Sequence, residues 1–317
     1  MSPHEMDRRE ALRRIGMVTA GLAMGAPGAA PAADSAASPG SILERPIPST
    51  REILPVIGIG TWQTFDVGSA AAERAPLEEV LQAFAQMGGT AIDSSPMYGR
   101  SEEVVGDLVA KTRAPANPFI ATKVWTSGRD AGIRQMRESM RKLRVKTCDL
   151  MQVHNLLDVD THLDTLADWK REGIVRYVGV THYTASGASD VAKVISRRSV
   201  DFVQINYSVA ERDAEERLLP LCRDKGVAVI ANRPFAGGEI FRRVAGKPVP
   251  DWAAEIDCTS WAQLMLKFIV AHPAINCAIP ASAKPEHTRD NMKGGYGRMP
   301  DEGLRRRIAE AISRYGT

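Results

Sequence analysis

Residues 119–154 read FIATKVWTSGRDAGIRQMRESMRKLRVKTCDLMQVH, and this stretch contains one complete strand, helix and strand unit. Its two ends, Phe119–Val124 and Asp149–His154, are short apolar runs that are typical of buried parallel strands. Between them, residues 131–143 place apolar side chains at helical spacing. A strand, a helix and a second strand in this order predict a right-handed βαβ unit with parallel strands.

The same alternation extends over most of the chain. The predicted strands are Val56–Gly60, Thr90–Ser94, Phe119–Val124, Asp149–His154, Val175–Val180, Phe202–Ile205, Val227–Ala231 and Cys277–Pro280. Helical segments separate them: Pro76–Gln86, Glu102–Val109, Ala131–Leu143, His162–Arg171, Ser189–Ser196, Ala214–Asp224 and Trp261–Ala271. Eight such repeats in roughly 250 residues favour an α/β fold of the (β/α)8 TIM barrel type, as a single domain. A doubly wound sheet is the alternative, but no G-x-G-x-x-G pattern follows the first strand.

The composition excludes several classes of protein. The 317 residues include 41 Lys and Arg against 38 Asp and Glu, with 44% hydrophobic residues, which is typical of a globular protein. No basic run is interleaved with aromatic residues, so nucleic-acid binding is not expected. Cys148, Cys222, Cys258 and Cys277 lack metal-ligand spacing, so no metal site is predicted. A disulfide between Cys258 and Cys277 is an alternative if the protein is exported.

Residues 1–32 have the features of an export signal. Arg8 and Arg9 precede a weakly apolar stretch, Ile15–Ala26, and the small residues 30–32 follow it. This order predicts a secretory signal peptide, and the paired arginines indicate the twin-arginine export machinery. We therefore expect a periplasmic location, or a cytoplasmic one if the signal does not function. The stretch is too short and too rich in glycine for a stable membrane span, and an amphipathic or disordered extension is the alternative.

Two further boundaries complete the predicted organisation. Residues 33–53 are rich in Ser, Pro and Gly and are predicted to be a linker. Residues 54–317 are predicted to form the barrel.

Polar side chains follow three neighbouring predicted strands. Asp93, Lys123 and His154 end or nearly end apolar runs, and Tyr98 lies five residues after Asp93. Each residue alone has a structural explanation, but the carboxyl ends of barrel strands meet at one rim, where catalytic residues gather. A nearby ammonium stabilises phenolate and lowers the pKa of a phenol, so Lys123 can tune Tyr98. Asp93 would keep Lys123 charged, and a neutral His154 would bind a substrate oxygen. Together they predict a general acid that protonates an oxygen.

Several short motifs resemble those of the aldo-keto reductases over residues 54–295. They are Gly58-Ile59-Gly60-Thr61-Trp62, Ile92-Asp93-Ser94-Ser95-x-x-Tyr98-Gly99, Thr122-Lys123, Gln152-Val153-His154, Val203-Gln204 and Ile279-Pro280-x-Ser282. The resemblance implies a (β/α)8 barrel and an NAD(P)H-dependent carbonyl reductase or alcohol dehydrogenase that works without a metal. It implies that Tyr98 is the acid, that Lys123 and Asp93 tune it, and that His154 orients the carbonyl. A non-catalytic nicotinamide-nucleotide sensor on the same barrel is the alternative.

The resemblance also implies a cofactor site along the same rim. Its residues are Gly60, Thr61, Trp62, Asp93, Asn155, Thr181, His182, Gln204, Arg233, Pro234, Phe235, Ser282, Lys284, His287 and Asn291. Asn232 stands where the family has an aromatic residue that stacks on nicotinamide, so Phe235 or Tyr207 would have to substitute. Arg233 is suited to a pyrophosphate, because a guanidinium binds phosphate through two parallel hydrogen bonds, and a surface ion pair is the alternative.

The adenosine end decides between the two nicotinamide cofactors. Ala281 and His287 stand where NADPH-using members carry Lys and Arg, which removes two positive charges from the expected 2′-phosphate site. Lys284 and Arg289 lie close in sequence and can compensate. NADPH is therefore expected, with NADH as the alternative.

The substrate pocket and its cover are predicted only in outline. Trp62, Met97 and Trp125 follow catalytic strands and predict a pocket for an apolar or aromatic carbonyl compound, although packing alone also explains them. Residues 236–257 are long enough to form a lid over the cofactor, with a surface insertion as the alternative.

Overall fold

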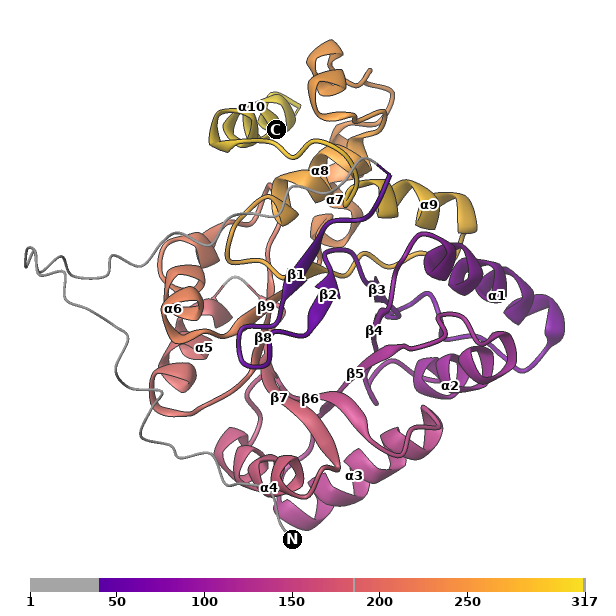
Figure 1. Cartoon of the computed structure of the whole chain (residues 1–317), viewed down its shortest axis with the longest axis vertical. Coiled ribbons are helices and arrows are strands. Elements are labelled where there is room, and N and C mark those ends of the chain that lie inside the picture. The colour runs from indigo at the N-terminus through magenta and orange to yellow at the C-terminus, as the bar shows by residue number, and fades with distance from the viewer. Residues whose placement is uncertain (1–39, 185, 316–317) are drawn as a thin grey trace, which may run out of the picture. The chain divides into compact units, whose positions relative to one another are not determined.

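Eight parallel strands form a ring at the centre of the structure, a computed structural model that describes residues 40–184 and 186–315 (Figure 1). In chain order they are β3 (Ile59–Gly60), β4 (Ala91–Asp93), β5 (Phe119–Val124), β6 (Cys148–His154), β7 (Val175–Thr181), β8 (Phe202–Asn206), β9 (Ala228–Asn232) and β10 (Cys277–Ala278). Each pairs with the next, and the ring closes because the Gly58 N–H donates to the Ala278 carbonyl at 2.9 Å. The predicted (β/α)8 barrel is confirmed.

Helices surround this ring (Figure 1). They are α1 (Ala71–Gln86), α2 (Ser101–Thr112), α3 (Arg129–Lys142), α4 (Val159–Arg171), α5 (Gly187–Arg197), α6 (Leu218–Lys225), α7 (Glu239–Arg243), α8 (Trp261–Val270), α9 (Pro285–Lys293) and α10 (Glu302–Ser313). Short 3-10 turns cover Asp213–Glu215, Ala236–Gly238 and Asp251–Ile256. Most helices bury one face, as α5 does through Val191, Val194 and Ile195. In contrast, α8 is buried along its whole length because α9 and α10 pack against it.

An antiparallel hairpin crosses the middle of the ring (Figure 1) and corrects the predicted linker. Its first strand, β1 (Glu44–Pro46), lies inside the segment 33–53 that was predicted to be a linker, and its second strand, β2 (Ile53–Pro55), begins at the last residue of that segment. Ile47 and Leu54 pack on the first residues of β5 and β8, Phe119 and Phe202, because the open end of a barrel exposes apolar side chains that need a cover. The hairpin therefore closes the amino-terminal end of the barrel.

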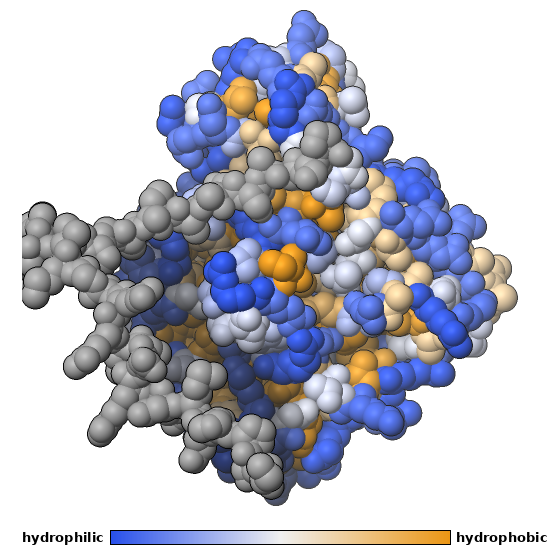
Figure 2. All heavy atoms as spheres, viewed as in Figure 1, coloured by the Kyte–Doolittle hydropathy of each residue, from blue (hydrophilic) through white to orange (hydrophobic). Residues whose placement is uncertain are grey.

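Among the described residues, the structure contains no disulfide and no helix that could span a membrane. All four cysteines are buried and free, and Cys148 and Cys277 are the first residues of β6 and β10. On the face that carries the hairpin, hydrophilic residues predominate and hydrophobic residues are scattered (Figure 2). Within residues 40–184 and 186–315, the helices are too short or too polar to cross a bilayer. The predicted signal peptide, residues 1–32, lies outside the described residues.

Candidate active site

The four predicted catalytic side chains meet at the carboxyl end of the barrel. Asp93 and His154 are the last residues of β4 and β6, and Lys123 is the last but one of β5. Tyr98 lies in the loop after β4, where its N–H donates to the Ser95 carbonyl at 3.0 Å. The parallel pairing of β4, β5 and β6 brings these loops and strand ends together, as the sequence predicted.

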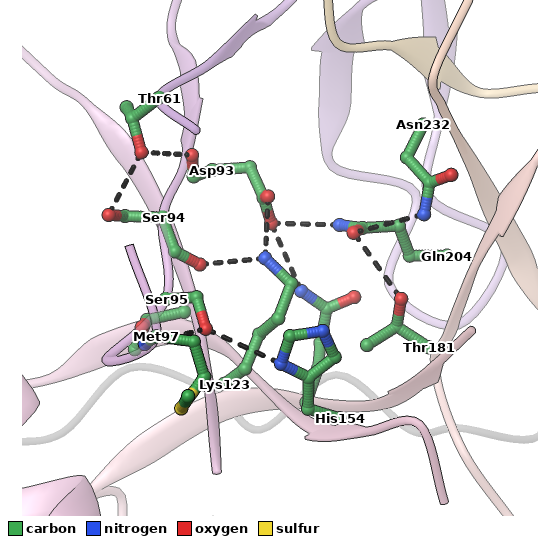
Figure 3. Close-up of polar contacts among 12 residues, drawn as sticks. Thr61, Asp93, Ser94, Ser95, Met97, Lys123, His154, Thr181, Gln204 and Asn232 are labelled. Atoms are coloured by element: carbon green, nitrogen blue, oxygen red, sulfur yellow. Dashed lines mark hydrogen bonds and ion pairs between the residues drawn. The ribbon is translucent and has the colours of Figure 1, made fainter. Parts of the chain in front are cut away.

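Asp93 and Lys123 form a buried ion pair beneath the site (Figure 3). The Lys123 ammonium donates to Asp93 Oδ2 at 2.6 Å and to the Ser94 carbonyl at 2.7 Å, and the two side chains are 1% and 4% exposed. Gln204 and Gln152 donate amide hydrogens to Asp93 Oδ1 at 2.8 and 3.2 Å. Burial acts to lower the pKa of Lys123, but attraction to Asp93 and Tyr98 outweighs it and raises that pKa. Lys123 is therefore a fixed positive charge.

Tyr98 lies against this charge. The Lys123 Nζ atom is 4.9 Å from the centroid of the Tyr98 ring. Burial raises the pKa of the Tyr98 phenol above its usual value, and the Lys123 ammonium opposes this shift without cancelling it. The sequence analysis expected Lys123 to lower the pKa of Tyr98, but the pKa is raised because burial of the ring has the larger effect. The spacing of residues in the sequence does not reveal this burial. The phenol consequently keeps its proton at neutral pH.

His154 is a neutral hydrogen-bond donor in this arrangement. Burial, followed by the charges of Lys123 and His182, lowers the pKa of His154 to about 3. The Ser95 hydroxyl oxygen accepts from the Met97 N–H at 3.3 Å and lies 3.4 Å from His154 Nδ1 (Figure 3). Among the described residues, Nδ1 is the acceptor within reach of the hydroxyl hydrogen, and donation to it corresponds to the tautomer with the imidazole hydrogen on Nε2. Ser95 is a site residue to which the sequence assigned no role.

A cavity of about 620 Å³ opens above these residues. Of the predicted residues, it is lined by Gly60, Thr61, Trp62, Asp93, Met97, Tyr98, Trp125, His154, Asn155, Gln204, Arg233, Pro234 and Phe235. Asn232, Tyr183 and Phe241 also line it. The sequence pointed to Asn232 only as a departure from the family pattern, and it gave no signal for Tyr183 or Phe241. The proposed substrate residues and most of the proposed cofactor residues thus share one cavity.

A second cavity of about 480 Å³ adjoins the first. Its lining includes the predicted residues His287 and Asn291, and it shares Phe235, Phe241 and Ala281 with the first cavity. Asp290 lines it as well, and its carboxylate accepts hydrogen bonds from the side chains of neighbouring residues. The second cavity therefore lies where the adenosine end of the cofactor was expected.

Four predicted cofactor residues line neither cavity. Thr181 is buried and its hydroxyl donates to Gln204 Oε1 at 3.3 Å. The His182 carbonyl accepts from the Asn232 amide at 3.2 Å, so these two residues support cavity-lining side chains. Ser282 exchanges hydrogen bonds with the backbone of Lys284 at the start of α9, and the Lys284 side chain is exposed.

Unpaired polar atoms around the first cavity fit a polar ligand such as a nicotinamide nucleotide. Buried side-chain atoms without a hydrogen-bond partner include Thr64 Oγ1, Asn155 Oδ1, Asn232 Oδ1 and Arg233 Nε, and all four residues line this cavity. Leaving a buried polar group unpaired costs about 1–3 kcal/mol, so these atoms are expected to gain partners when a ligand binds. Amide and guanidinium groups match the carboxamide and phosphates of such a nucleotide.

Only one of the two suggested aromatic substitutes for Asn232 reaches the site. Tyr207 is buried away from the cavity, with its hydroxyl accepting from Arg305 at 2.7 Å, whereas Phe235 lines both cavities.

Across the described residues, no cluster of three or more His, Cys, Asp or Glu side chains is arranged to hold a metal ion.

Comparison with known proteins gives a consistent result. The profile of the Aldo/keto reductase family matches residues 56–304. The methylglyoxal reductase YeaE of Escherichia coli (strain K12) is 26% identical over 245 residues, which cover 75% of this chain and 84% of the relative. The aldo-keto reductase AKR2E4 of Bombyx mori is 27% identical over 267 residues, covering 75% and 83%. A crystal structure of an aldo-keto reductase from Klebsiella pneumoniae in complex with NADPH aligns with a TM-score of 0.67 and 26% identity, over 83% of this chain and 92% of that one.

Proposed function

The chain belongs to the Aldo/keto reductase family, and on this premise we propose that it reduces a small-molecule aldehyde or ketone to an alcohol with a nicotinamide nucleotide. The observation that carries the proposal is the contact of Tyr98, which lines the cavity with His154, with the buried Lys123–Asp93 pair beneath it. A nucleophile for hydrolysis is not part of this set, whereas a proton donor with a stabilised conjugate base is.

Each residue has a role in moving one proton. When bound, a nicotinamide nucleotide would supply the hydride chemistry. Tyr98 donates its hydroxyl proton to the carbonyl oxygen as negative charge develops there, and the Lys123 ammonium stabilises the resulting phenolate. Asp93 keeps Lys123 charged and in place, and the Nε2–H of His154 binds the same carbonyl oxygen.

NADPH is the proposed cofactor. The structural relative from Klebsiella pneumoniae in complex with NADPH supports it. Asn155 and Gln204 would hold the carboxamide, and His287 and Asn291 would lie at the adenosine end. Among the described residues, the lining of the second cavity contains no Lys or Arg, so NADH is the alternative to be compared in every titration.

The proposed substrate is an apolar or aromatic carbonyl compound. In the described part of the chain, six large hydrophobic side chains are exposed, and five of them line the first cavity: Trp62, Met97, Trp125, Tyr183 and Phe241. Exposed apolar side chains gathered at one cavity mark a binding surface, because binding removes that surface from water. We therefore expect kcat/KM to be higher for aromatic aldehydes than for methylglyoxal. Equal or reversed values would contradict this assignment.

The test of the reductase is the substitution Tyr98→Phe. Loss of the proton donor is expected to lower kcat by about 10² to 10⁴ while nucleotide binding is unchanged. Tyr183→Phe is the matched control, because it removes a hydroxyl from the same cavity and is expected to keep kcat. A Tyr98→Phe protein that reduces carbonyls at the wild-type rate would contradict the proposal. A sensor would show nucleotide binding with no turnover in either protein.

We propose that residues 1–32 direct export by the twin-arginine route, a proposal supported only by Arg8, Arg9 and the apolar stretch after them. Fractionation of producing cells should place the wild-type chain in the periplasm and an Arg8→Lys, Arg9→Lys variant in the cytoplasm. The same distribution for both proteins would contradict this role.

A further inference from the structure

The two cavities together have the arrangement of a site for a two-part ligand. The first contains Tyr98 and Gln204 and the second contains His287 and Asn291, while Phe235, Phe241 and Ala281 line both. The Phe235 and Phe241 rings lie 4.7 Å apart at this junction. A ligand that occupied both cavities would therefore place its middle portion beside the shared residues. In a nicotinamide dinucleotide, that middle portion is the diphosphate.

Arg233 lies close in sequence to this junction, and none of the ion pairs among the described residues includes its guanidinium. It follows β9 directly, lies two residues before Phe235, and lines the first cavity. Within the described chain, it is the only Lys or Arg that lines either cavity. Its Nε atom is buried without a partner, and no carboxylate of the described residues lies within ion-pair distance of the guanidinium. Glu239 of α7 attracts the Arg233 guanidinium at longer range, but its ion pair is with Arg243.

A turn that contains two glycines passes close to the guanidinium of Arg233. A Cβ atom on Gly237 would lie 3.4 Å from Arg233 Nη2 and 3.7 Å from Nη1, so the turn Ala236–Gly238 passes close to the charged group. Arg233 and Ala236 have φ values of 50° and 49°, which non-glycine residues seldom adopt. Such local strain is found where the surrounding structure fixes a functional side chain.

We propose that Arg233 binds the diphosphate of the nicotinamide dinucleotide. This inference rests on the proposed function and adds the residue that anchors the middle of the cofactor. A guanidinium forms two parallel hydrogen bonds with phosphate oxygens, and these charge-assisted bonds satisfy the free Nε–H and the unpaired charge together. Because the diphosphate is common to NADPH and NADH, Arg233 contributes to the binding of both.

Titration of the full chain with NADPH and with NADH, followed by tryptophan fluorescence, tests this assignment. Arg233→Met is expected to raise Kd for both nucleotides by a similar factor, of about 10 to 100, because a hydrogen-bonded charge is lost. Arg233→Lys keeps the charge without the bidentate geometry and is expected to give an intermediate Kd. Arg242→Met is the matched control: it removes the same charge from an exposed arginine of α7, and the wild-type Kd is expected.

If Arg233 binds a different group, the titrations will give different results, and each of these results would overturn the assignment. Weakened binding of NADPH alone would identify a 2′-phosphate site. An unchanged Kd for both nucleotides with a raised KM for a carboxylate-bearing carbonyl compound would identify a substrate site. An unchanged Kd without any kinetic effect would leave Arg233 no role in binding. If the wild-type protein bound neither nucleotide, both the proposed function and the Arg233 assignment would be wrong. If the wild-type protein bound nucleotide and Arg233→Met bound it equally well, only the Arg233 assignment would be wrong.

Discussion

At the scale of single residues, Ser95 is expected to act on catalysis through His154. Ser95→Ala removes the hydroxyl 3.4 Å from Nδ1 and leaves the imidazole free to carry its hydrogen on either nitrogen. We expect kcat/KM to fall by about 3- to 10-fold, since one weak hydrogen bond is worth about 1 kcal/mol. The ¹⁵N chemical shifts of the imidazole should move toward a mixture of tautomers.

Ser196→Ala is the control for this prediction, because it removes a hydroxyl that bonds only to the Ala192 carbonyl in α5. It should leave both the rate and the imidazole shifts unchanged. Imidazole shifts in Ser95→Ala identical to those of the wild type would show that Ser95 does not set the tautomer.

The depressed pKa of His154 also predicts how stability depends on pH. The pKa is about 3 in the folded protein against 6.5 for an ordinary histidine, so below pH 6.5 the unfolded chain binds more protons. The contribution of His154 to stability is complete above pH 6.5 and decreases as the pH falls toward 3. At pH 5 the loss is about 2 kcal/mol, from 1.36 kcal/mol per pH unit.

Urea unfolding at pH 7 and pH 5 measures this effect. The decrease in unfolding free energy should be smaller for His154→Gln than for the wild type. His272 has a pKa of about 4 and contributes in the same direction, so part of the decrease is expected to remain in the variant. An equal decrease in both proteins would mean that His154 titrates normally.

The sequence predicted the positions of the four catalytic candidates because strand ends in a barrel share one rim. It did not predict the net pKa shift of Tyr98, the contact of Ser95 with His154, or the place of Tyr183 in the cavity. Burial and side-chain direction decide these three features, and both depend on residues distant in the chain.

At the scale of elements, Lys267 holds α8 to two neighbouring segments. This fully buried residue donates to the carbonyls of Ile256, Tyr296 and Arg298 at 2.7, 2.6 and 2.8 Å. Lys267→Met would leave three buried carbonyls without this donor, so we expect the unfolding free energy to fall by at least about 3 kcal/mol. Because α8 also lines the second cavity through Trp261 and Ala262, nucleotide binding should weaken as well.

Urea unfolding measures this change, with Lys293→Met, at an exposed position of α9, as the control. The control should differ from the wild type by no more than about 0.5 kcal/mol. A Lys267→Met protein as stable as the wild type would show that water replaces the ammonium without cost.

Strand and helix boundaries followed the apolar pattern closely in some repeats, whereas α1 (Ala71–Gln86) begins five residues before the predicted start and α6 (Leu218–Lys225) begins four residues after it. Phe119–Val124 matches β5, and the predicted helix 131–143 falls almost entirely within α3, at 129–142. The pattern failed where an element does not alternate apolar and polar residues. The hairpin β1 and β2 is only three residues per strand and lies in a Ser- and Pro-rich stretch, so tertiary packing rather than periodicity determines it.

At the scale of the whole molecule, the two ends of the barrel have different tasks. The amino-terminal end is closed by the hairpin through Ile47 and Leu54, while the carboxyl end holds the cavities, Tyr98 and Arg233. Substitutions in the hairpin should therefore change stability, and substitutions at the other rim should change binding and turnover.

The barrel itself was predictable because eight strands alternate with helices, whereas the junction of two cavities at Phe235 depends on the folded segment after β9.

The proposed reaction is the transfer of hydride from a nicotinamide nucleotide to a carbonyl carbon, with the proton supplied by Tyr98. Its most direct test is single-turnover reduction of an aromatic aldehyde by the purified full chain with NADPH deuterated at C4 of the nicotinamide ring. We expect deuterium on the carbinol carbon of the product in the wild type and almost none in Tyr98→Phe over the same time. Nucleotide binding without any deuterium transfer in the wild type would contradict it.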